Sequence, residues 1–104
     1  MAEVIWTRAA YLVLEGLSQA TAFGIFRLSE HLARFSELGS QILRPRHLTK
    51  YRQIIYKKTH RTIYRYDKPT DCVIIVNLQN CRQMPPTAKQ IHRAENDDRE
   101  LPLE

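Results

Sequence analysis

Apolar positions in the first third of the chain recur at helical spacing. A short β-rich stretch at residues 3–7 is expected to form a first strand, and Thr7 is placed to cap a helix that begins at Arg8. We expect a break near Ser18 and then a second helix over residues 21–36. The apolar stripe of this second helix should pack against a sheet and consists of Ile25, Leu28, Leu32 and Phe35.

The pattern changes to that of strands in the second half of the chain. Gly39 is placed to end the second helix, and residues 41–49 should form a loop because Pro45 neither continues a helix nor fits a strand. The apolar run "CVIIV" indicates a strand that is covered on both faces or central in its sheet. In all, three strands are predicted here, with a hairpin turn at "KKTH" between the first two: residues 51–56, 61–66 and 72–79.

The predicted order is therefore β-α-α-β-β-β. This is an α+β domain in which two helices pack on one face of a small, mostly antiparallel sheet. We assign residues 1–86 to the domain and residues 87–104, which are polar and charged, to a C-terminal tail that is either a marginal helix or disordered.

Composition narrows the class of protein. The chain has 104 residues, room for one domain, and its 43% hydrophobic content suffices for a modest core without metals or disulfides. Cys72 and Cys81 do not have the spacing of a zinc site, so we interpret them as structural thiols of a reducing compartment. The sequence shows neither a membrane-spanning run of about 18 apolar residues nor a signal peptide, which predicts a cytoplasmic location.

Positive charge is concentrated in the middle of the chain. Residues 44–68 hold nine Lys and Arg residues against Asp67 alone, a net charge of +8, whereas residues 89–104 carry a net charge of −2. Such a basic segment suits a polyanion or an acidic protein segment as partner, although a merely solvated face would show the same pattern.

Strand alternation predicts where these cations point. Arg61 and Arg65 should share one face of their strand, while Tyr64 packs under the helices on the other. Antiparallel pairing would bring Arg52 to the arginine face, and Asn77 and Gln79 should point away from Ile74, Val76 and Leu78. The predicted polyanion surface comprises Arg52, Arg61, Arg65, Asn77, Gln79 and Arg82, with Lys57 and Lys58 at its rim. This surface suits RNA and an acidic protein helix equally well.

Four segments taken in order resemble the RelE/ParE superfamily of bacterial toxin–antitoxin toxins. They are "VIWTRAA", "ARFSELGS", "YRQIIYKKTHRTIYRYD" and "VIIVNLQNCRQMPP", and the resemblance extends over about residues 3–86. The resemblance implies the toxin of a type II, plasmid-stabilisation module that is neutralised by an acidic antitoxin, in a possible hetero-oligomer. It implies no cofactor or metal.

One branch of the superfamily, the RelE-like toxins, cuts mRNA on the ribosome. If this chain is such a ribonuclease, the resemblance implies Arg61, Arg52 and Arg82 as the catalytic cations. Many members have histidine near the end of the last strand, but here Gln79 stands nearby and cannot transfer protons at neutral pH. The remaining candidate proton carriers are His60, Tyr51 and Tyr56, each with a structural interpretation as well.

The other branch, the ParE-like toxins, poisons DNA gyrase and needs no acid–base pair. The missing histidine and the ending "CRQMPP" favour this branch, whereas the short helical pair is more typical of RelE. From the sequence we favour the ParE-like function, with the RelE-like ribonuclease as the alternative. A member that only binds its antitoxin is a further alternative.

Overall fold

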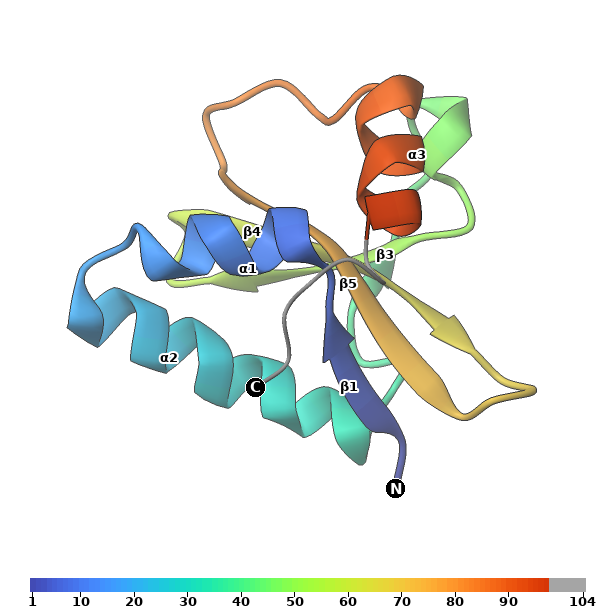
Figure 1. Cartoon of the computed structure of the whole chain (residues 1–104), viewed down its shortest axis with the longest axis horizontal. Helices are drawn as coiled ribbons and strands as arrows, with labels where there is room; N and C mark the ends of the chain where they lie inside the picture. Colours follow the sequence, from blue (N-terminus) through green and yellow to red (C-terminus); the bar gives the residue numbers. More distant parts are fainter. Residues whose placement is uncertain (98–104) are drawn as a thin grey trace.

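A mixed five-stranded sheet with the strand order β1-β5-β4-β3-β2 forms the centre of the computed structural model, which describes residues 1–97 (Figure 1). β1 runs parallel to β5, and every other neighbouring pair is antiparallel. The predicted α+β class is confirmed. The strands are β1 (Glu3–Trp6), β2 (Ser40–Gln41), β3 (Arg52–Tyr56), β4 (His60–Asp67) and β5 (Cys72–Asn80).

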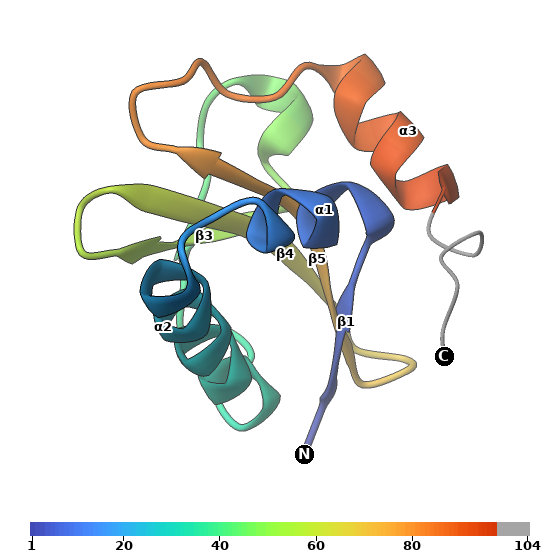
Figure 2. The same ribbon diagram turned by 60° about the vertical axis from the view of Figure 1, so that its left-hand side comes forward.

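Helices cover both faces of this sheet. α1 (Arg8–Glu15) and α2 (Gln19–Glu30) lie on one face, and α3 (Ala88–Asp97) packs on the other, so that Figure 2 shows α2 and α3 on opposite sides of the sheet. Two 3₁₀ turns, η1 (His31–Ala33) and η2 (Arg46–Leu48), complete the described elements. None of the helices in this part of the chain has the length and apolar character needed to cross a membrane.

Polar caps fix where the first two helices begin. The Thr7 hydroxyl accepts a hydrogen bond from the Ala10 backbone N–H at 3.4 Å and donates one to the Ile75 carbonyl at 2.8 Å, which ties the start of α1 to β5. Ser18 caps α2 by accepting from the Thr21 N–H at 3.3 Å. Both the Thr7 cap and the break near Ser18 are therefore confirmed.

The end of the second helix differs from the prediction. α2 ends at Glu30 and continues as η1, so the predicted span of residues 21–36 is wrong at its C-terminal end. A 3₁₀ turn has 3.0 residues per turn instead of 3.6, which rotates the following side chains away from the apolar stripe. Phe35 is accordingly 55% exposed and lies outside the core to which we assigned it.

The segment between the helices and β3 is also more ordered than expected. Gly39 does not cap a helix, and the predicted loop at residues 41–49 contains the end of β2 and all of η2. The Gly39 N–H donates a hydrogen bond to the Tyr64 hydroxyl at 2.9 Å, so this loop is fastened to β4. A Cβ at position 39 would lie 2.6 Å from the Gln53 carbonyl oxygen, which leaves room only for glycine.

Apolar clusters on both faces of the sheet hold the layers together. On the α1–α2 face, Tyr64, Val73 and Ile75 are fully buried with Ala10 and Leu32. The cluster on the α3 face consists of Ile42, Leu48, Tyr51, Ile63, Val76 and Ile91. The run "CVIIV" of β5 thus contributes to both faces, as its continuous apolar character predicted, and α3 supplies part of the core through Ile91.

The segment after residue 86 lies partly within the described residues. Of the two alternatives for it, a helix is present over Ala88–Asp97, and residues 98–104 lie outside the part of the chain that the structure describes. The buried residues of this helix, Ile91 and Ala94, are three positions apart and therefore lie on one face.

A register shift in the β4–β5 pairing changes which side chains share a face. Ile63 pairs with Asn77, but the next residue, Tyr64, pairs with Ile75, so that β5 has one extra residue at Val76. Ile74 consequently pairs with Arg65 and lies on the same face as Gln79. The prediction that Ile74 and Val76 point away from Asn77 and Gln79 is therefore wrong, because it assumed unbroken alternation.

Replacement of Gly39 by alanine tests the close approach of this residue to β3 and β4. We expect Gly39→Ala to lower the free energy of unfolding by about 1–3 kcal/mol, since the new methyl group meets backbone and a buried ring. Urea unfolding checks this. Gly16→Ala is the control: its Cβ would lie 3.5 Å from the nearest atom outside its neighbours, an ordinary contact, so little loss of stability is expected. Equal effects of the two substitutions would contradict the packing argument.

Candidate functional site

Arg61 is held in a fixed orientation on β4. Its Nε donates a hydrogen bond to Gln79 Oε1 at 2.8 Å, and its Nη2 donates to the Gln83 carbonyl at 2.7 Å. Gln79 is only 7% exposed, and its amide nitrogen donates in turn to the Met84 carbonyl at 3.1 Å. The amide of Gln79, which carries no acid–base function, therefore orients this guanidinium and fastens the segment after β5.

Two lysines form the tip of the β3–β4 hairpin. The Thr59 N–H donates to the Tyr56 carbonyl at 2.9 Å, and Lys57 and Lys58 between them have φ values of 47° and 63°. This left-handed region favours glycine and asparagine and costs other residues about 1 kcal/mol each. The turn keeps two exposed ammonium groups at that cost. Asp71, in the turn before β5, has a positive φ of 54° as well, so it is the exposed charge together with the strained backbone that makes the two lysines candidates for binding.

The turn after β5 brings a further cation to the same end of the sheet. The Cys81 N–H donates to the Thr59 carbonyl at 2.8 Å, so this turn lies beside the hairpin tip. Arg82 follows it with an exposed side chain, while its backbone N–H donates to Asn80 Oδ1 at 2.8 Å. We call the resulting group the hairpin-end cations: Lys57, Lys58, Arg61 and Arg82.

Arg52 does not belong to this group. It pairs with Tyr64 across β3 and β4, and therefore lies on the face opposite Arg61. Its Nη1 donates to the Gly39 carbonyl at 2.7 Å and to the Glu37 carbonyl at 3.3 Å, which fixes the loop before β2. The prediction of one continuous surface with Arg52 beside Arg61 is wrong because the register, which sets the face, was not readable from sequence.

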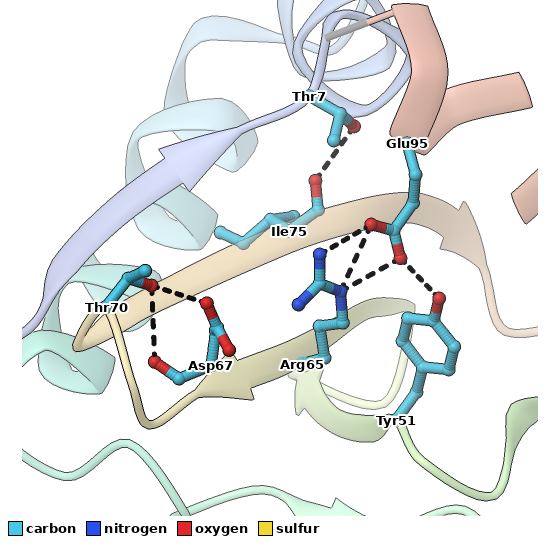
Figure 3. A network of polar contacts seen from close by, with 7 residues as sticks. All are labelled: Thr7, Tyr51, Arg65, Asp67, Thr70, Ile75 and Glu95. Carbon is cyan, nitrogen blue, oxygen red and sulfur yellow. Dashed lines mark hydrogen bonds and ion pairs between the residues drawn. The ribbon is translucent and has the colours of Figure 1, made fainter. Parts of the chain in front are cut away.

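Arg65 lies on the Arg61 face but is engaged inside the protein. Figure 3 shows its guanidinium against the Glu95 carboxylate of α3, with Nη2 donating to Oε1 at 2.7 Å and Nε to Oε2 at 3.0 Å. The Tyr51 hydroxyl donates to the same carboxylate. The charge of Arg65 is thus balanced by Glu95, a residue that sequence reasoning missed. The available signal was its place four residues after Ile91, on the apolar side of a helix.

This network shifts the acid–base properties of its members. Burial raises the pKa of the Glu95 carboxyl, but the hydrogen bonds from Arg65 and Tyr51 outweigh burial and hold that pKa below its usual value. Burial and the hydrogen bond to Glu95 raise the pKa of the Tyr51 hydroxyl. Tyr51 therefore stays protonated and serves as a hydrogen-bond donor.

The proposed proton carriers do not lie beside Arg61. His60 pairs with Tyr56 on the opposite face of the hairpin, where its Nδ1 is 2.9 Å from the Thr59 hydroxyl. Tyr51 is bound to Glu95.

On the Arg61 face, Asn77 Oδ1 is buried without a hydrogen-bond partner among the described residues. Within residues 1–97, no cluster of His, Cys, Asp and Glu could hold a metal ion. The arrangement is suited to binding and stabilising negative charge.

Glu95→Gln tests the link between α3 and the sheet. The folded-state pKa of Glu95 is lower than in the unfolded chain, so its ion pair contributes stability that is fully present above about pH 4.3 and is lost as the pH falls through the folded-state value. We expect the substitution to lower the free energy of unfolding by about 1–3 kcal/mol at pH 7, with a difference from the wild type that shrinks toward pH 3.

Urea unfolding across this pH range provides the measurement. Glu37→Gln is the matched control, because its ion pair with Lys68 spans 3.8 Å between exposed side chains and should contribute little. A difference between Glu95→Gln and the wild type that stays constant with pH would rule out the carboxylate as its source.

The hairpin tip provides a test in which stability should rise. The double substitution Lys57→Asn with Lys58→Gly should increase the free energy of unfolding by about 1 kcal/mol or more, since both residues then suit the left-handed conformation. Replacement of both lysines by alanine removes the same charges but keeps the backbone cost, so it should not stabilise. Equal stabilisation in both variants would identify charge repulsion as the cause.

Comparison with known proteins agrees with this architecture. Neither models of known protein families nor curated protein sequences match the chain. Among solved structures, a chain of the toxin–antitoxin complex RelBE2 from Mycobacterium tuberculosis is similar with a TM-score of 0.68 and 21% identity, covering 76% of this chain and 96% of that chain. The isolated E. coli RelE toxin is similar with a TM-score of 0.67 and 11% identity, covering 97% of this chain and 100% of that chain. The resemblance seen in the sequence is thereby confirmed in its architecture: this chain has the fold of the RelE toxins.

Proposed function

We propose that this chain is the toxin of a toxin–antitoxin module and acts as a RelE-type endoribonuclease on ribosome-bound mRNA. The observation that carries the proposal is the fixed guanidinium of Arg61, with the other hairpin-end cations around it, on this fold. Both similar structures contain RelE proteins, which supports the alternative function inferred from sequence better than the ParE-like one that we favoured there. The short α1 and α2, of 8 and 12 residues, also suit the RelE-like branch.

Cleavage of a phosphodiester builds negative charge on the phosphoryl oxygens in the transition state. A guanidinium whose orientation is already fixed stabilises this charge with little loss of side-chain entropy, and arginine can bind two phosphate oxygens at once. Because Gln79 cannot exchange protons at neutral pH, the contribution we assign to this chain is positioning and electrostatic stabilisation. Lys57, Lys58 and Arg82 would bind the flanking phosphates.

An antitoxin partner follows from the same proposal. The basic middle of the chain would attract an acidic segment, and a hollow of about 590 Å³ along α1 and α2 offers apolar contacts. Tyr11, Phe23 and Phe26 line this hollow and are 38%, 60% and 41% exposed. The similarity of this chain to a chain of the RelBE2 toxin–antitoxin complex supports a partner of this kind.

Induction of the protein without antitoxin in growing bacteria tests the function. We expect methionine incorporation to fall before thymidine incorporation, because translation is the first process affected. An early loss of thymidine incorporation would instead support gyrase poisoning. If neither falls, the toxin function is contradicted, and the alternative of an inactive member that only binds its antitoxin is favoured.

Arg61→Ala tests the assigned residue directly. Purified protein should cut mRNA only when ribosomes are present, and the substitution should slow cleavage by about 100-fold or more. Arg8→Ala is the matched control, since Arg8 is exposed at the start of α1, away from the hairpin end. Thermal unfolding of both variants separates loss of activity from loss of fold. Full activity of a folded Arg61→Ala protein would contradict the assignment.

A further inference from the structure

A small pocket adjoins Arg61 on the sheet face that carries it. Its volume is about 140 Å³, and it lies between β3–β4, the segment after β2, and Pro85 in the connection to α3. Five apolar residues form most of its wall: Ile42, Leu43, Leu48, Ile63 and Pro85. The polar residues that line it are Arg44, Gln53 and Arg61.

The volume suits a single aromatic ring. A cavity of about 150 Å³ lined by leucine, isoleucine and phenylalanine side chains accepts benzene. A pocket of about 140 Å³ therefore has room for one six-membered ring, whereas a fused two-ring system would project from it. The flat apolar faces of a nucleobase match walls made of Ile63 and Pro85.

The polar groups of the pocket can also recognise a bound base by hydrogen bonding. Gln53 pairs with Ile63 across β3 and β4, so both lie on the Arg61 face. The Gln53 side chain is half-buried and makes no hydrogen bond to another described residue. A carboxamide offers both a donor and an acceptor, which complements the adjacent donor and acceptor on the edge of a pyrimidine base. Arg44 is exposed and adds positive charge next to this site.

Arg61 connects this pocket to the phosphate backbone. Its Nε and Nη2 are engaged by Gln79 and Gln83, and no described residue accepts from its Nη1. The side chain thus keeps donors available while its orientation is fixed. An anionic group bound there would lie beside the opening of the pocket, as the phosphate of a nucleotide lies beside its base.

We propose that this pocket receives one pyrimidine base of single-stranded RNA, with the neighbouring phosphate on Arg61. The inference rests on the proposed function in that RNA is the substrate. It adds that the protein itself selects the base at one position, through the size of the pocket and the Gln53 amide.

NMR titration of the isolated, ¹⁵N-labelled protein tests base binding without ribosomes. The probes are uridine 3′-monophosphate, adenosine 3′-monophosphate and inorganic phosphate. Uridine 3′-monophosphate should shift the Gln53 side-chain amide and the Ile42 and Ile63 backbone amides, and should bind about fivefold or more tightly than the adenosine probe. Gln53→Ala should weaken uridine binding by a similar factor. Phosphate should affect Arg61 but leave the pocket resonances unchanged.

A second variant fills the pocket without replacing a buried core residue. Leu43 is 72% exposed and lines the pocket, so the indole of Leu43→Trp should occupy it and abolish the uridine-specific shifts. Leu38→Trp is the matched control, at a leucine that is 55% exposed and lies outside the pocket. Unchanged uridine binding in a folded Leu43→Trp protein would overturn the proposal. So would equal shifts with phosphate alone, or shifts produced by poly-glutamate but by neither nucleotide.

Ribosome-dependent cleavage separates this proposal from the proposed function. Wild-type protein should prefer one position next to a pyrimidine, and Leu43→Trp should lose that preference while keeping its dependence on Arg61. Cleavage of mRNA without any uridine-specific shift would overturn the base pocket and leave the ribonuclease function intact. Specific uridine binding without cleavage would support the pocket and overturn the ribonuclease function.

Discussion

The pairing of β4 with β5 positions most of the groups that matter in this protein. Eight residue pairs join the two strands, and the single shift between Ile63 and Tyr64 divides them into two sections. Because a shift of one residue exchanges the two faces of a strand, the extra residue in β5 places both Gln79 and Ile74 on the side that faces α3. In the first section Arg61 lies beside the Gln79 amide that orients it, and in the second Arg65 lies beneath Glu95. The shift thus separates the section of the pairing that contains Arg61 from the section that contains Arg65.

The environments of the two arginines explain why a highly basic segment does not behave as one uniform surface. A guanidinium that is partly removed from water is stable only if its charge is compensated, and Glu95 provides this for Arg65 at 2.7 Å. The charge of Arg52 is compensated by hydrogen bonds to two backbone carbonyls. The cations at the hairpin end lack a carboxylate partner among the described residues. The hairpin-end cations therefore keep their positive charge available at one end of the sheet, where it would act on a bound polyanion.

Local features of this fold could be predicted from the sequence, and long-range ones could not. Thr7 and the strands followed from capping and apolar pattern, since these signals lie within a few residues of their effect. Arg52 was assigned to the wrong face of the sheet because strand register depends on a partner strand. Phe35 was wrongly assigned to the core because a 3₁₀ turn interrupts the helical period. Glu95 and Arg65 are 30 residues apart, so their pairing depends on how α3 crosses the sheet.

The sequence predicted which residues belong to the candidate site better than it predicted how they are arranged. Lys57, Lys58, Arg61 and Arg82 were all identified as cations, yet what distinguishes them is the backbone around them. The two lysines occupy a left-handed turn that costs about 1 kcal/mol each, and Arg61 is oriented by a buried glutamine that sequence reasoning treated mainly as a missing histidine. Local rules are usually broken where function outweighs stability. The backbone of the turn and the hydrogen bonds of Arg61 hold these cations near one another despite their mutual repulsion, as the proposed stabilisation of a charged transition state would require.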